Sequence, residues 1–489
     1  MSEHTKNPAF LLSTEQKIEF NDKNLETAIK DSLKLGSNEN ITALNILKLT
    51  HFRALEKNIS DLSGLEYAEN LQLVTLTGNK ITSLDPLRNL NQLYSVGFAY
   101  NPDLKMEEIL KLEHLTELDL SGNQYSAKEF TQLEKYSDMV ILWLNSCQLD
   151  SISFMSGMKK LVQLQVQNNN LTNIDELGSS SLIGIWAMNN RIKSLKNVRN
   201  LTGLKRLWID NNKLTSLDWL NKLDNVSHVY ASYNQIEKVV ISGHKQIYLL
   251  QLDNSQVTDV ELHDLPSLMQ VSLDYNKLTS FNKVTNLPAL QSLSLIDNTK
   301  LTDIDGISVA TKLVRLVLQG CTGISDFSPI SSLKKIVALY CNHTDMTDEQ
   351  INDIGVQNQL SLLAVANCKL TNIDFISHFP ALKQFALMSN HISNISQMGD
   401  NISTYSAINQ TISLGDVALG EKTEIQLKGR NSQRVDNIEW LTEGSITAEG
   451  DKQNLVWANS GENQLTFSWQ EDTGTTPAFS GTITQTVNK

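Results

Sequence analysis

Between residues 69 and 410 the chain repeats one pattern of apolar and polar positions. In residues 115–123, Leu115, Leu118 and Leu120 occupy positions 1, 4 and 6, and Asn123 occupies position 9. Side chains alternate along a strand, so positions 4 and 6 face the interior and positions 3, 5 and 7 face outward. The position-9 side chain turns inward and bonds backbone groups of the turn that would otherwise be buried without partners. The pattern therefore predicts one short strand in each repeat.

The pattern returns about every 22 residues, a period and phrase typical of leucine-rich repeats. We count about 15 copies, which predict an α/β solenoid: a leucine-rich-repeat horseshoe with its strands on one concave face. Position 9 is asparagine in most copies and a small residue in the others. These ladder residues are Asn79, Asn101, Asn123, Cys147, Asn169, Asn190, Asn212, Asn234, Ser255, Asn276, Asn298, Cys321, Thr344, Cys368 and Asn390.

The return segments, which connect one strand to the next, follow a second pattern. Residues 81–87 and 214–220 are too short for a full α-helix and predict 3₁₀ turns. Residues 106–112, 127–136 and 347–354 are longer or more helical in pattern. In the last of these, a threonine followed three residues later by glutamine predicts a capping box.

The two ends of the chain depart from the repeat. Residues 1–17 are polar and are predicted to be disordered. Residues 18–68 predict a helical cap, because a solenoid must cover the open edge of its first repeat. The main helix of this cap should begin after Asn21 or Asp22, either of which suits the N-cap position, and a shorter helix should follow Thr42.

Residues 411–489 lack the 22-residue period and read as six short strands separated by turns. Leu465, Phe467 and Trp469 alternate with polar residues, as in a half-buried strand. About 79 residues with strands of this kind predict a small immunoglobulin-like β-sandwich, here without cysteines. No linker separates it from residues 69–410, so we expect a rigid joint.

Composition excludes several classes of function. The net charge of −13 and the lack of a long basic run argue against a nucleic-acid partner. No apolar stretch approaches the roughly 20 residues that span a bilayer, so membrane insertion is not expected. The polar start, Met1 to Thr5, has none of the features of a secretory signal.

Chemistry-bearing residues are scattered rather than clustered. The four cysteines all fall at inward positions of the repeat and predict free, buried thiols rather than disulfides or a metal site. No metal-ligand spacing, nucleophile motif or phosphate-binding loop occurs. We therefore expect no enzyme activity, no cofactor and no metal.

Large aromatic residues gather instead at outward positions of five consecutive repeats. An exposed tryptophan is costly in water, and Trp, Tyr and Arg dominate interface energetics. We interpret the group as a partner-binding surface; the alternative is that the rings only pack on each other and stabilise the sheet. The candidate residues are Trp143, Gln165, Trp186, Met188, Arg206, Trp208, Asp210, His228, Tyr230 and Tyr233.

The chain resembles the internalin family of bacterial surface and secreted proteins. Residues 79–87 (N-K-I-T-S-L-D-P-L) match its repeat pattern, and residues 478–485 (A-F-S-G-T-I-T-Q) are similar to its closing motif. A helical cap before the repeats and an immunoglobulin-like domain after them complete the likeness, which covers about residues 18–489. The D-I-S/T-P-L return segment of the family is lost in several repeats, for example at residues 193–198 and 257–263.

The resemblance implies a monomeric, extracellular or cell-surface adhesin whose concave face binds a host protein. Neither a secretion signal nor a wall-anchoring L-P-x-T-G motif occurs in the sequence, so export and anchoring are expectations from the family. Two other hypotheses remain. The Trp and Tyr platform is also suited to a glycan, with Gln165, Asp210 and Gln251 as flanking polar groups, and the chain is also compatible with a wall-associated spacer that has no ligand.

Overall fold

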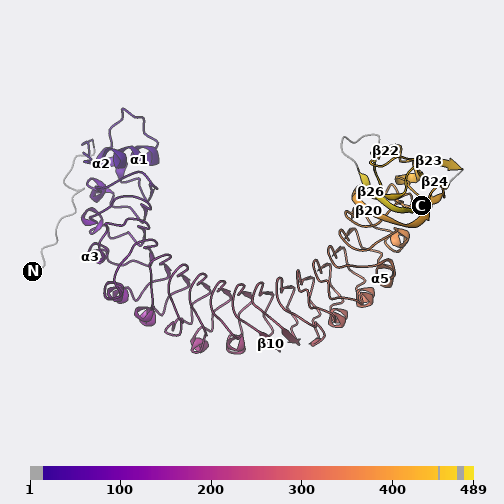
Figure 1. Cartoon of the computed structure of the whole chain (residues 1–489). Coiled ribbons are helices and arrows are strands. Elements are labelled where there is room, and N and C mark those ends of the chain that lie inside the picture. The colour runs from indigo at the N-terminus through magenta and orange to yellow at the C-terminus, as the bar shows by residue number, and fades with distance from the viewer. Residues whose placement is uncertain (1–14, 450–451, 471–477) are drawn as a thin grey trace, which may run out of the picture. The chain divides into compact units, whose positions relative to one another are not determined.

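The computed structural model describes residues 15–449, 452–470 and 478–489. The predicted disordered segment, residues 1–17, therefore lies almost entirely outside the described residues. The chain divides into two compact units, Met1–Gln235 and Ile236–Lys489. In each unit, short parallel strands of successive coils lie side by side, and the return segments occupy the other side, as α3 and α5 do in Figure 1. Both units are leucine-rich-repeat solenoids.

The first unit begins with helix α1 (Lys23–Leu33), which Asp22 caps, and helix α2 (Ala43–Ile46), which Thr42 caps. Strand β1 (His51–Arg53) follows and pairs in parallel with β2 (Leu73–Thr75). The repeat pattern did not predict β1, because the ladder position after it is occupied by lysine. The ladder asparagine of the next coil, Asn79, accepts the amide hydrogens of Lys57 and Ile59 instead.

Seven further strands continue the parallel sheet of the first unit, each with a buried middle residue and outward neighbours. They are β3 (Ser95–Gly97), β4 (Glu117–Asp119), β5 (Ile141–Trp143), β6 (Gln163–Gln165), β7 (Gly184–Trp186), β8 (Arg206–Trp208) and β9 (His228–Tyr230). The return segments form short helices: η2 (Leu65–Tyr67), η3 (Asp85–Leu87), α3 (Met106–Ile109), α4 (Ala127–Thr131), η4 (Gln132–Lys135), η5 (Ser153–Gly157), η6 (Val198–Asn200) and η7 (Asp218–Lys222). The segments η3 and η7 are 3₁₀ turns, as the sequence predicts.

The second unit carries the ladder onward through its own parallel strands: β11 (Leu249–Gln251), β13 (Gln270–Ser272), β15 (Ser292–Ser294), β16 (Arg315–Val317), β17 (Ala338–Tyr340), β18 (Leu362–Ala364), β19 (Gln384–Ala386) and β20 (Thr404–Ala418). Its helical return segments are η8 (Asp305–Val309), η9 (Ser328–Ser332), α5 (Asp348–Asp353) and η10 (Asp374–His378). Thr347 and Gln350 form the predicted capping box at α5.

Three return segments of the second unit form strands, which the sequence did not predict. Strands β10 (Lys238–Ser242), β12 (Asp259–His263) and β14 (Val284–Thr285) pair in parallel as a separate sheet. Buried Val239 and Ile241 alternate with exposed neighbours. This period of two replaces the D-I-S/T-P-L turn, so the backbone extends rather than coils.

The C-terminal strands form two sheets. Strand β20 leaves the repeat ladder and continues into a sheet with β26 (Phe479–Asn488), β25 (Gly461–Trp469) and β22 (Asn437–Trp440). Strands β21 (Thr423–Ile425), β24 (Lys452–Trp457) and β23 (Gly444–Glu449) form the other sheet, and a short turn, η11 (Arg430–Ser432), precedes β22. Strand β23 was not among the predicted strands. Whether this sandwich is immunoglobulin-like stays a prediction, as does the capping role of residues 18–68.

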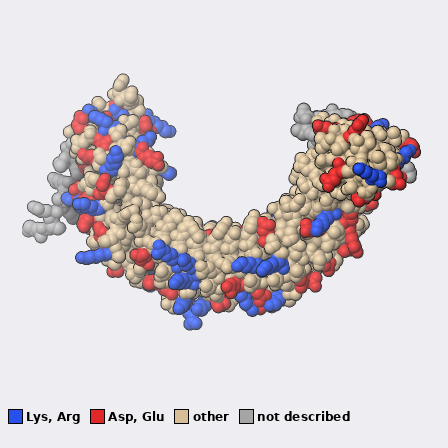
Figure 2. Space-filling model, viewed as in Figure 1, with Lys and Arg blue, Asp and Glu red and all other residues tan. Residues whose placement is uncertain are grey.

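Charged side chains are distributed unevenly over the coils. Figure 2 shows Lys, Arg, Asp and Glu gathered mainly over the return side, while most of the visible sheet side carries other residues. Among the described residues, no helix is both long and apolar enough to cross a membrane. The sheet side therefore carries fewer charged side chains than the return side.

Candidate functional site

The candidate site is a row of side chains on the open face of strands β5–β9 in the first unit. Parallel pairing sets Trp143 beside Gln165, Gln165 beside Trp186, Trp186 beside Trp208, and Trp208 beside Tyr230. All five occupy outward position 5 and are half-buried. Along each strand, the residues before and after position 5 face the core. The position-5 side chain therefore points away from the core, toward the open face of the sheet.

Three members of the row form a continuous aromatic stack: Trp186, Trp208 and Tyr230. The ring centroids of Trp186 and Trp208 are 4.4 Å apart with planes 9° from parallel. Those of Trp208 and Tyr230 are 5.4 Å apart with planes 3° from parallel. Both faces of Trp208 are thus covered by neighbouring rings, and the stack offers mainly ring edges to solvent.

One glutamine, Gln165, and one glycine, Gly184, determine where the stack begins. Gln165 separates Trp143 from Trp186 in the row, and its Oε1 accepts a hydrogen bond from Asn145 Nδ2 at 3.3 Å. The Trp186 ring lies over Gly184 on its own strand, where a Cβ atom would be 2.8 Å from ring atom Cζ3. Trp143 is therefore a neighbour of the aromatic stack rather than a member of it.

A second row, at position 3, contributes positive charge. Arg206 lies between Gly184 and His228 in the register and is exposed. Burial, and then the charge of Arg206, lowers the pKa of His228 below its ordinary value of 6.5. His228 is therefore neutral at pH 7, and Nδ1 of its ring lies 2.8 Å from Ser227 Oγ.

The other side of the stack carries the remaining candidates. Asp210 accepts the amide hydrogen of Ser232 at 2.9 Å. Met188, two residues after the end of β7, is half-buried. Tyr233 stands at position 8 with φ 57°, and its side chain is 60% exposed. The aromatic stack is thus bordered by a cation on one side and by a carboxylate, a thioether and a phenol on the other.

The structure places all ten predicted residues on this one face of the first unit. Their role in binding stays a prediction, because geometry alone identifies no partner. The sequence correctly indicated which side chains point outward and offered packing of the rings on each other as an alternative, but it did not indicate that Trp143 stands apart from the other three rings. We call the ten residues together the aromatic patch.

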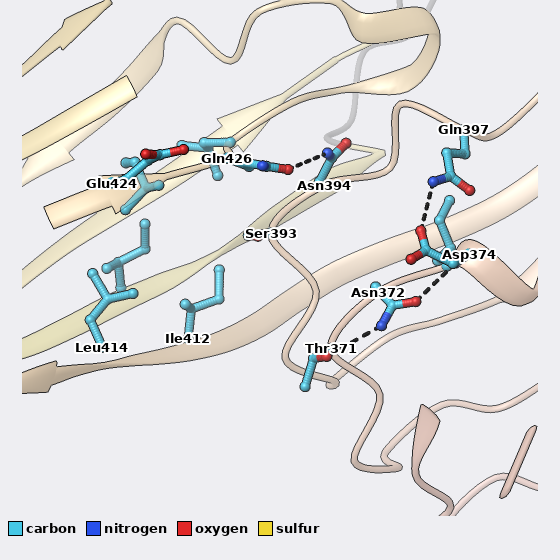
Figure 3. Close-up of a pocket in the computed structure, with 14 residues that line it drawn as sticks. Thr371, Asn372, Asp374, Ser393, Asn394, Gln397, Ile412, Leu414, Glu424 and Gln426 are labelled. Atoms are coloured by element: carbon cyan, nitrogen blue, oxygen red, sulfur yellow. Dashed lines mark hydrogen bonds between the residues drawn. The ribbon is translucent and has the colours of Figure 1, made fainter. Parts of the chain in front are cut away.

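Two further surface features lie in the second unit. A cavity of about 480 Å³ lies between the last coils and strands β20 and β21 (Figure 3). A hollow of about 270 Å³ on the sheet face is lined by Tyr340, Ala364, Ala386 and neighbouring residues. Sequence reasoning missed the cavity, because it depends on side chains from coils and strands that are distant in sequence.

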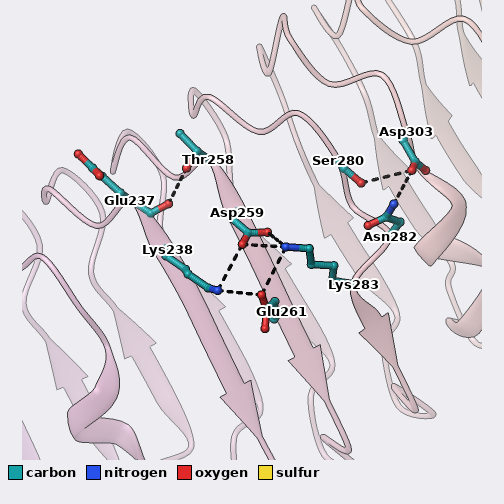
Figure 4. Close-up of polar contacts among 9 residues, drawn as sticks. All are labelled: Glu237, Lys238, Thr258, Asp259, Glu261, Ser280, Asn282, Lys283 and Asp303. Atoms are coloured by element: carbon teal, nitrogen blue, oxygen red, sulfur yellow. Dashed lines mark hydrogen bonds and ion pairs between the residues drawn. The ribbon is translucent and has the colours of Figure 1, made fainter.

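Charged side chains of the second unit also meet on the return side. Lys238 and Lys283 each contact both Asp259 and Glu261, at N–O distances of 2.9–3.5 Å (Figure 4). Two cations and two anions compensate one another, so the cluster has little net charge to attract a ligand. Partly exposed ion pairs of this kind contribute little to stability.

Within the described part of the chain, no metal or reactive-thiol centre is evident. Among residues 15–449, 452–470 and 478–489, no group of three or more His, Cys, Asp or Glu side chains is placed to hold a metal ion. All four cysteines are buried and unpaired. Burial raises the pKa of the Cys147 and Cys321 thiols to about 12, so neither forms a reactive thiolate near neutral pH.

Comparison with solved structures places this architecture among known proteins. The functional domain of InlJ from Listeria monocytogenes, which includes a cysteine ladder, superposes with a TM-score of 0.63 at 21% identity, covering 98% of this chain and 100% of that one. A leucine-rich-repeat protein of Leptospira interrogans gives a TM-score of 0.57 at 20% identity over 72% of this chain and 93% of that one. TLR13 in its complex with ssRNA13 gives a TM-score of 0.57 at 17% identity, covering 78% of this chain and 60% of that one. No family model and no curated protein matches the sequence.

Proposed function

Because the chain has the fold of internalin-like leucine-rich-repeat proteins, we propose that it is a non-enzymatic binding module of a bacterial surface or secreted protein. Its aromatic patch on β5–β9 would hold a host protein in adhesion or another host interaction. The observation that carries the proposal is the stack of Trp186, Trp208 and Tyr230, half-buried on an open sheet face with Arg206 exposed beside it.

The composition of the aromatic patch suits a protein interface. Trp, Tyr and Arg are enriched among residues that cost more than about 2 kcal/mol when truncated. The rings are already ordered by stacking, so binding would cost less side-chain entropy than ordering free side chains. Arg206 and Asp210 add one charge of each sign, which favours a partner of defined orientation.

The stacking geometry argues against a glycan as the main ligand. Sugars contact aromatic rings through ring faces, and both faces of Trp208 are occupied by Trp186 and Tyr230. Ring edges next to an arginine and a carboxylate match a protein surface better. A ligand-free spacer would need the stack only for stability of the sheet.

The test compares binding of the purified chain to host cells with that of Trp186→Ala/Trp208→Ala. We expect the double variant to bind on the order of 30-fold more weakly or not at all, since loss of a hot spot removes about 2 kcal/mol or more. Circular dichroism checks that both proteins fold. The matched control is Tyr94→Ala/Tyr100→Ala, which removes exposed aromatic rings outside the patch (39% and 54% exposed).

The possible results separate the hypotheses. Loss of binding only in the tryptophan variant supports the proposal, and crosslinking with mass spectrometry then identifies the host protein. Equal binding by all three proteins would refute the aromatic patch as the site. Binding that disappears when host cells are deglycosylated would favour the glycan hypothesis, and no binding by any of the proteins would favour the spacer.

A further inference from the structure

Positive charge gathers in one stretch of the first unit, although the chain as a whole is acidic. Residues 191–222 contain eight lysines and arginines and only two acidic residues, whereas the whole chain has a net charge of −13. All eight cations are exposed. Six of them follow the ladder turns of two adjacent coils rather than the strands, and we call these six the basic track: Arg191, Lys193, Lys196, Arg199, Lys213 and Lys222.

One position of the basic track reverses the charge that neighbouring coils carry. Six residues beyond the ladder asparagine, the preceding coil has Asp175 and the following coil has Asp218. The coil between them has Lys196 at this position. Asp175 Oδ1 accepts the backbone amide hydrogens of Lys196 and Asn197 at 2.9 and 3.1 Å. This carboxylate is therefore engaged with the backbone rather than with the Lys196 ammonium group.

The cations of the basic track have no counter-charge of their own. Along the sequence, the ion pairs of the described residues pass from Lys160 with Asp138 to Lys238 with Asp259 and Glu261. None of these pairs involves a lysine or arginine that lies between Lys160 and Lys238. A local excess of unpaired positive charge attracts anions, and it does so even when the net charge of the protein is negative.

Like charges also lie side by side on the two coils. The Lys213 amide donates to Ile192 O at 2.8 Å, which sets Lys213 beside Arg191. Lys222 Nζ donates to Lys196 O at 3.2 Å, so this ammonium group lies against the lysine of the neighbouring coil. Neighbouring cations repel each other, and a bound anion would offset that repulsion.

A row of asparagine amides borders the basic track. Asn168, Asn189 and Asn211 occupy position 8 of three successive coils and are exposed, with φ of 59°, 55° and 51°. Asn189 Nδ2 donates to Asn168 Oδ1, and Asn211 Nδ2 donates to Asn189 Oδ1, both at 2.7 Å. Each amide keeps a second N–H. Arg191 and Lys213 stand two residues beyond Asn189 and Asn211, so this flank offers mainly hydrogen-bond donors.

We propose that the basic track and the asparagine row together bind a sulfated polysaccharide. A guanidinium group offers paired donors to an oxyanion such as sulfate, and an ammonium group offers a point charge. The amide N–H groups suit the hydroxyl and carbonyl oxygens of the sugar units. The backbone from Arg191 to Lys196 spans at most about 18 Å when extended, so the basic track matches a few sugar units of a linear chain.

The surroundings argue against nucleic acid as the occupant. Single-stranded nucleic acid is held partly by stacking of its bases on exposed aromatic rings. Residues 191–222 contain two aromatic residues, Trp208 and Trp219. Both faces of Trp208 are covered by Trp186 and Tyr230. Trp219 is buried, and its Nε1 donates to Ser216 O at 3.1 Å. A sulfated polysaccharide needs no such ring.

The test measures binding of the full-length protein to immobilised heparin by biolayer interferometry. We expect binding that weakens as the salt concentration rises and no competition by fully desulfated heparin. Arg191→Gln/Lys213→Gln should lower the affinity about tenfold or more, because two charge-assisted contacts are lost. The control Lys312→Gln/Lys335→Gln removes two exposed lysines of the second unit, and it should bind heparin as the unmodified chain does.

A third variant tests the asparagine row. Asn189→Asp keeps a residue that tolerates positive φ but replaces the amide donors with a carboxylate, so it should also weaken heparin binding about tenfold. Circular dichroism checks that each variant folds. Trp186→Ala/Trp208→Ala should bind heparin normally, which separates this inference from the proposed function.

Four results would overturn the inference. They are a lack of heparin binding by the unmodified chain, equal competition by desulfated heparin, unchanged binding by Arg191→Gln/Lys213→Gln or Asn189→Asp, and stronger competition by inorganic polyphosphate than by soluble heparin. Polyphosphate carries charge but no sugar, so the last result would mean that charge alone is recognised.

Discussion

At the scale of a residue, one buried asparagine shows how the repeat is held. Asn212 Nδ2 donates to Ala187 O at 2.9 Å and to Ile209 O at 3.0 Å, while its Oδ1 accepts the Ile192 amide hydrogen at 2.9 Å. One side chain thus satisfies backbone groups of its own coil and of the coil before it. Where the ladder position is a cysteine, the thiol replaces the Nδ2 donor of asparagine but not its Oδ1 acceptor. Cys147 Sγ, for example, donates to Leu120 O at 3.4 Å.

This difference predicts graded losses of stability. Asn212→Ala should lower the free energy of unfolding by about 3 kcal/mol, because buried donors and acceptors lose their partners. Asn212→Cys should cost roughly half as much, since a thiol keeps a weak donor. Urea titrations followed by circular dichroism measure both, with the exposed Asn221→Ala as a control expected to stay within about 0.5 kcal/mol. Equal losses for Ala and Cys would contradict the role given to the donor.

At the scale of an element, helix α1 is joined to the first coil through its N-cap. Asp22 Oδ1 accepts the amide hydrogens of Asn24 and Leu25 at 2.9 and 3.1 Å, and Oδ2 accepts that of Ser60 at 2.8 Å. Burial pushes the pKa of the Asp22 carboxyl upward, but the backbone donors together outweigh it and hold the pKa below its ordinary value of 3.8. The ionised carboxylate therefore stabilises both the helix and its attachment.

The lowered pKa sets the sign of a pH dependence. Asp22→Ala should lower the free energy of unfolding by about 1–2 kcal/mol at neutral pH. A carboxyl with a depressed folded-state pKa contributes stability above its unfolded pKa of about 3.9 and loses it as the pH falls through the folded value. The difference in free energy of unfolding between the unmodified chain and Asp22→Ala should therefore disappear in strong acid. Asp31→Ala, at an exposed position within α1, serves as the control. A stability difference that widens in acid would disprove the charge dependence of the cap.

At the scale of the whole molecule, the repeats and the C-terminal strands of the second unit are connected through β20. Strand β26 approaches β20 closely at Gly481, where a Cβ atom would lie 2.4 Å from Gln410 O and 2.9 Å from its carbonyl carbon. Gln410 occupies the ladder position of the last coil, donating to Leu387 O at 2.9 Å and accepting from the Ile392 amide at 3.0 Å. A glycine in the closing motif thus permits the sandwich to pack against the end of the ladder.

A methyl group at this point should loosen the junction. We expect Gly481→Ala to lower the free energy of unfolding by about 1–3 kcal/mol, as overpacking against backbone does. Gly415→Ala on β20 is the matched control, because nothing lies within 4 Å of its Cβ position. Denaturant titration by tryptophan fluorescence reports the change through buried Trp457 and Trp469. Equal midpoints for the two variants would show that the close approach is not needed.

Much of the fold followed from local pattern. The spacing of leucines and asparagines identified the strands and their outward positions, because a period of two and a buried turn leave little choice of side-chain direction. Capping residues such as Asp22 and Thr347 marked helix starts, since a cap bonds amides within its own first turn. The outward placement of Trp186, Trp208 and Tyr230 was likewise determined by the sequence.

Tertiary structure decided what depends on partners distant in sequence. Strands β1 and β10 form because neighbouring coils supply their hydrogen bonds. The sequence pattern of their own repeats does not indicate these strands. The aromatic stack forms because the register brings Trp208 between Trp186 and Tyr230, while Gln165 keeps Trp143 out of it. The cavity beside the last coils exists because β20 leaves the ladder and, together with β21, lines it. In each case the sequence determined the direction of a side chain, and only the packing of separate coils determined what that side chain meets.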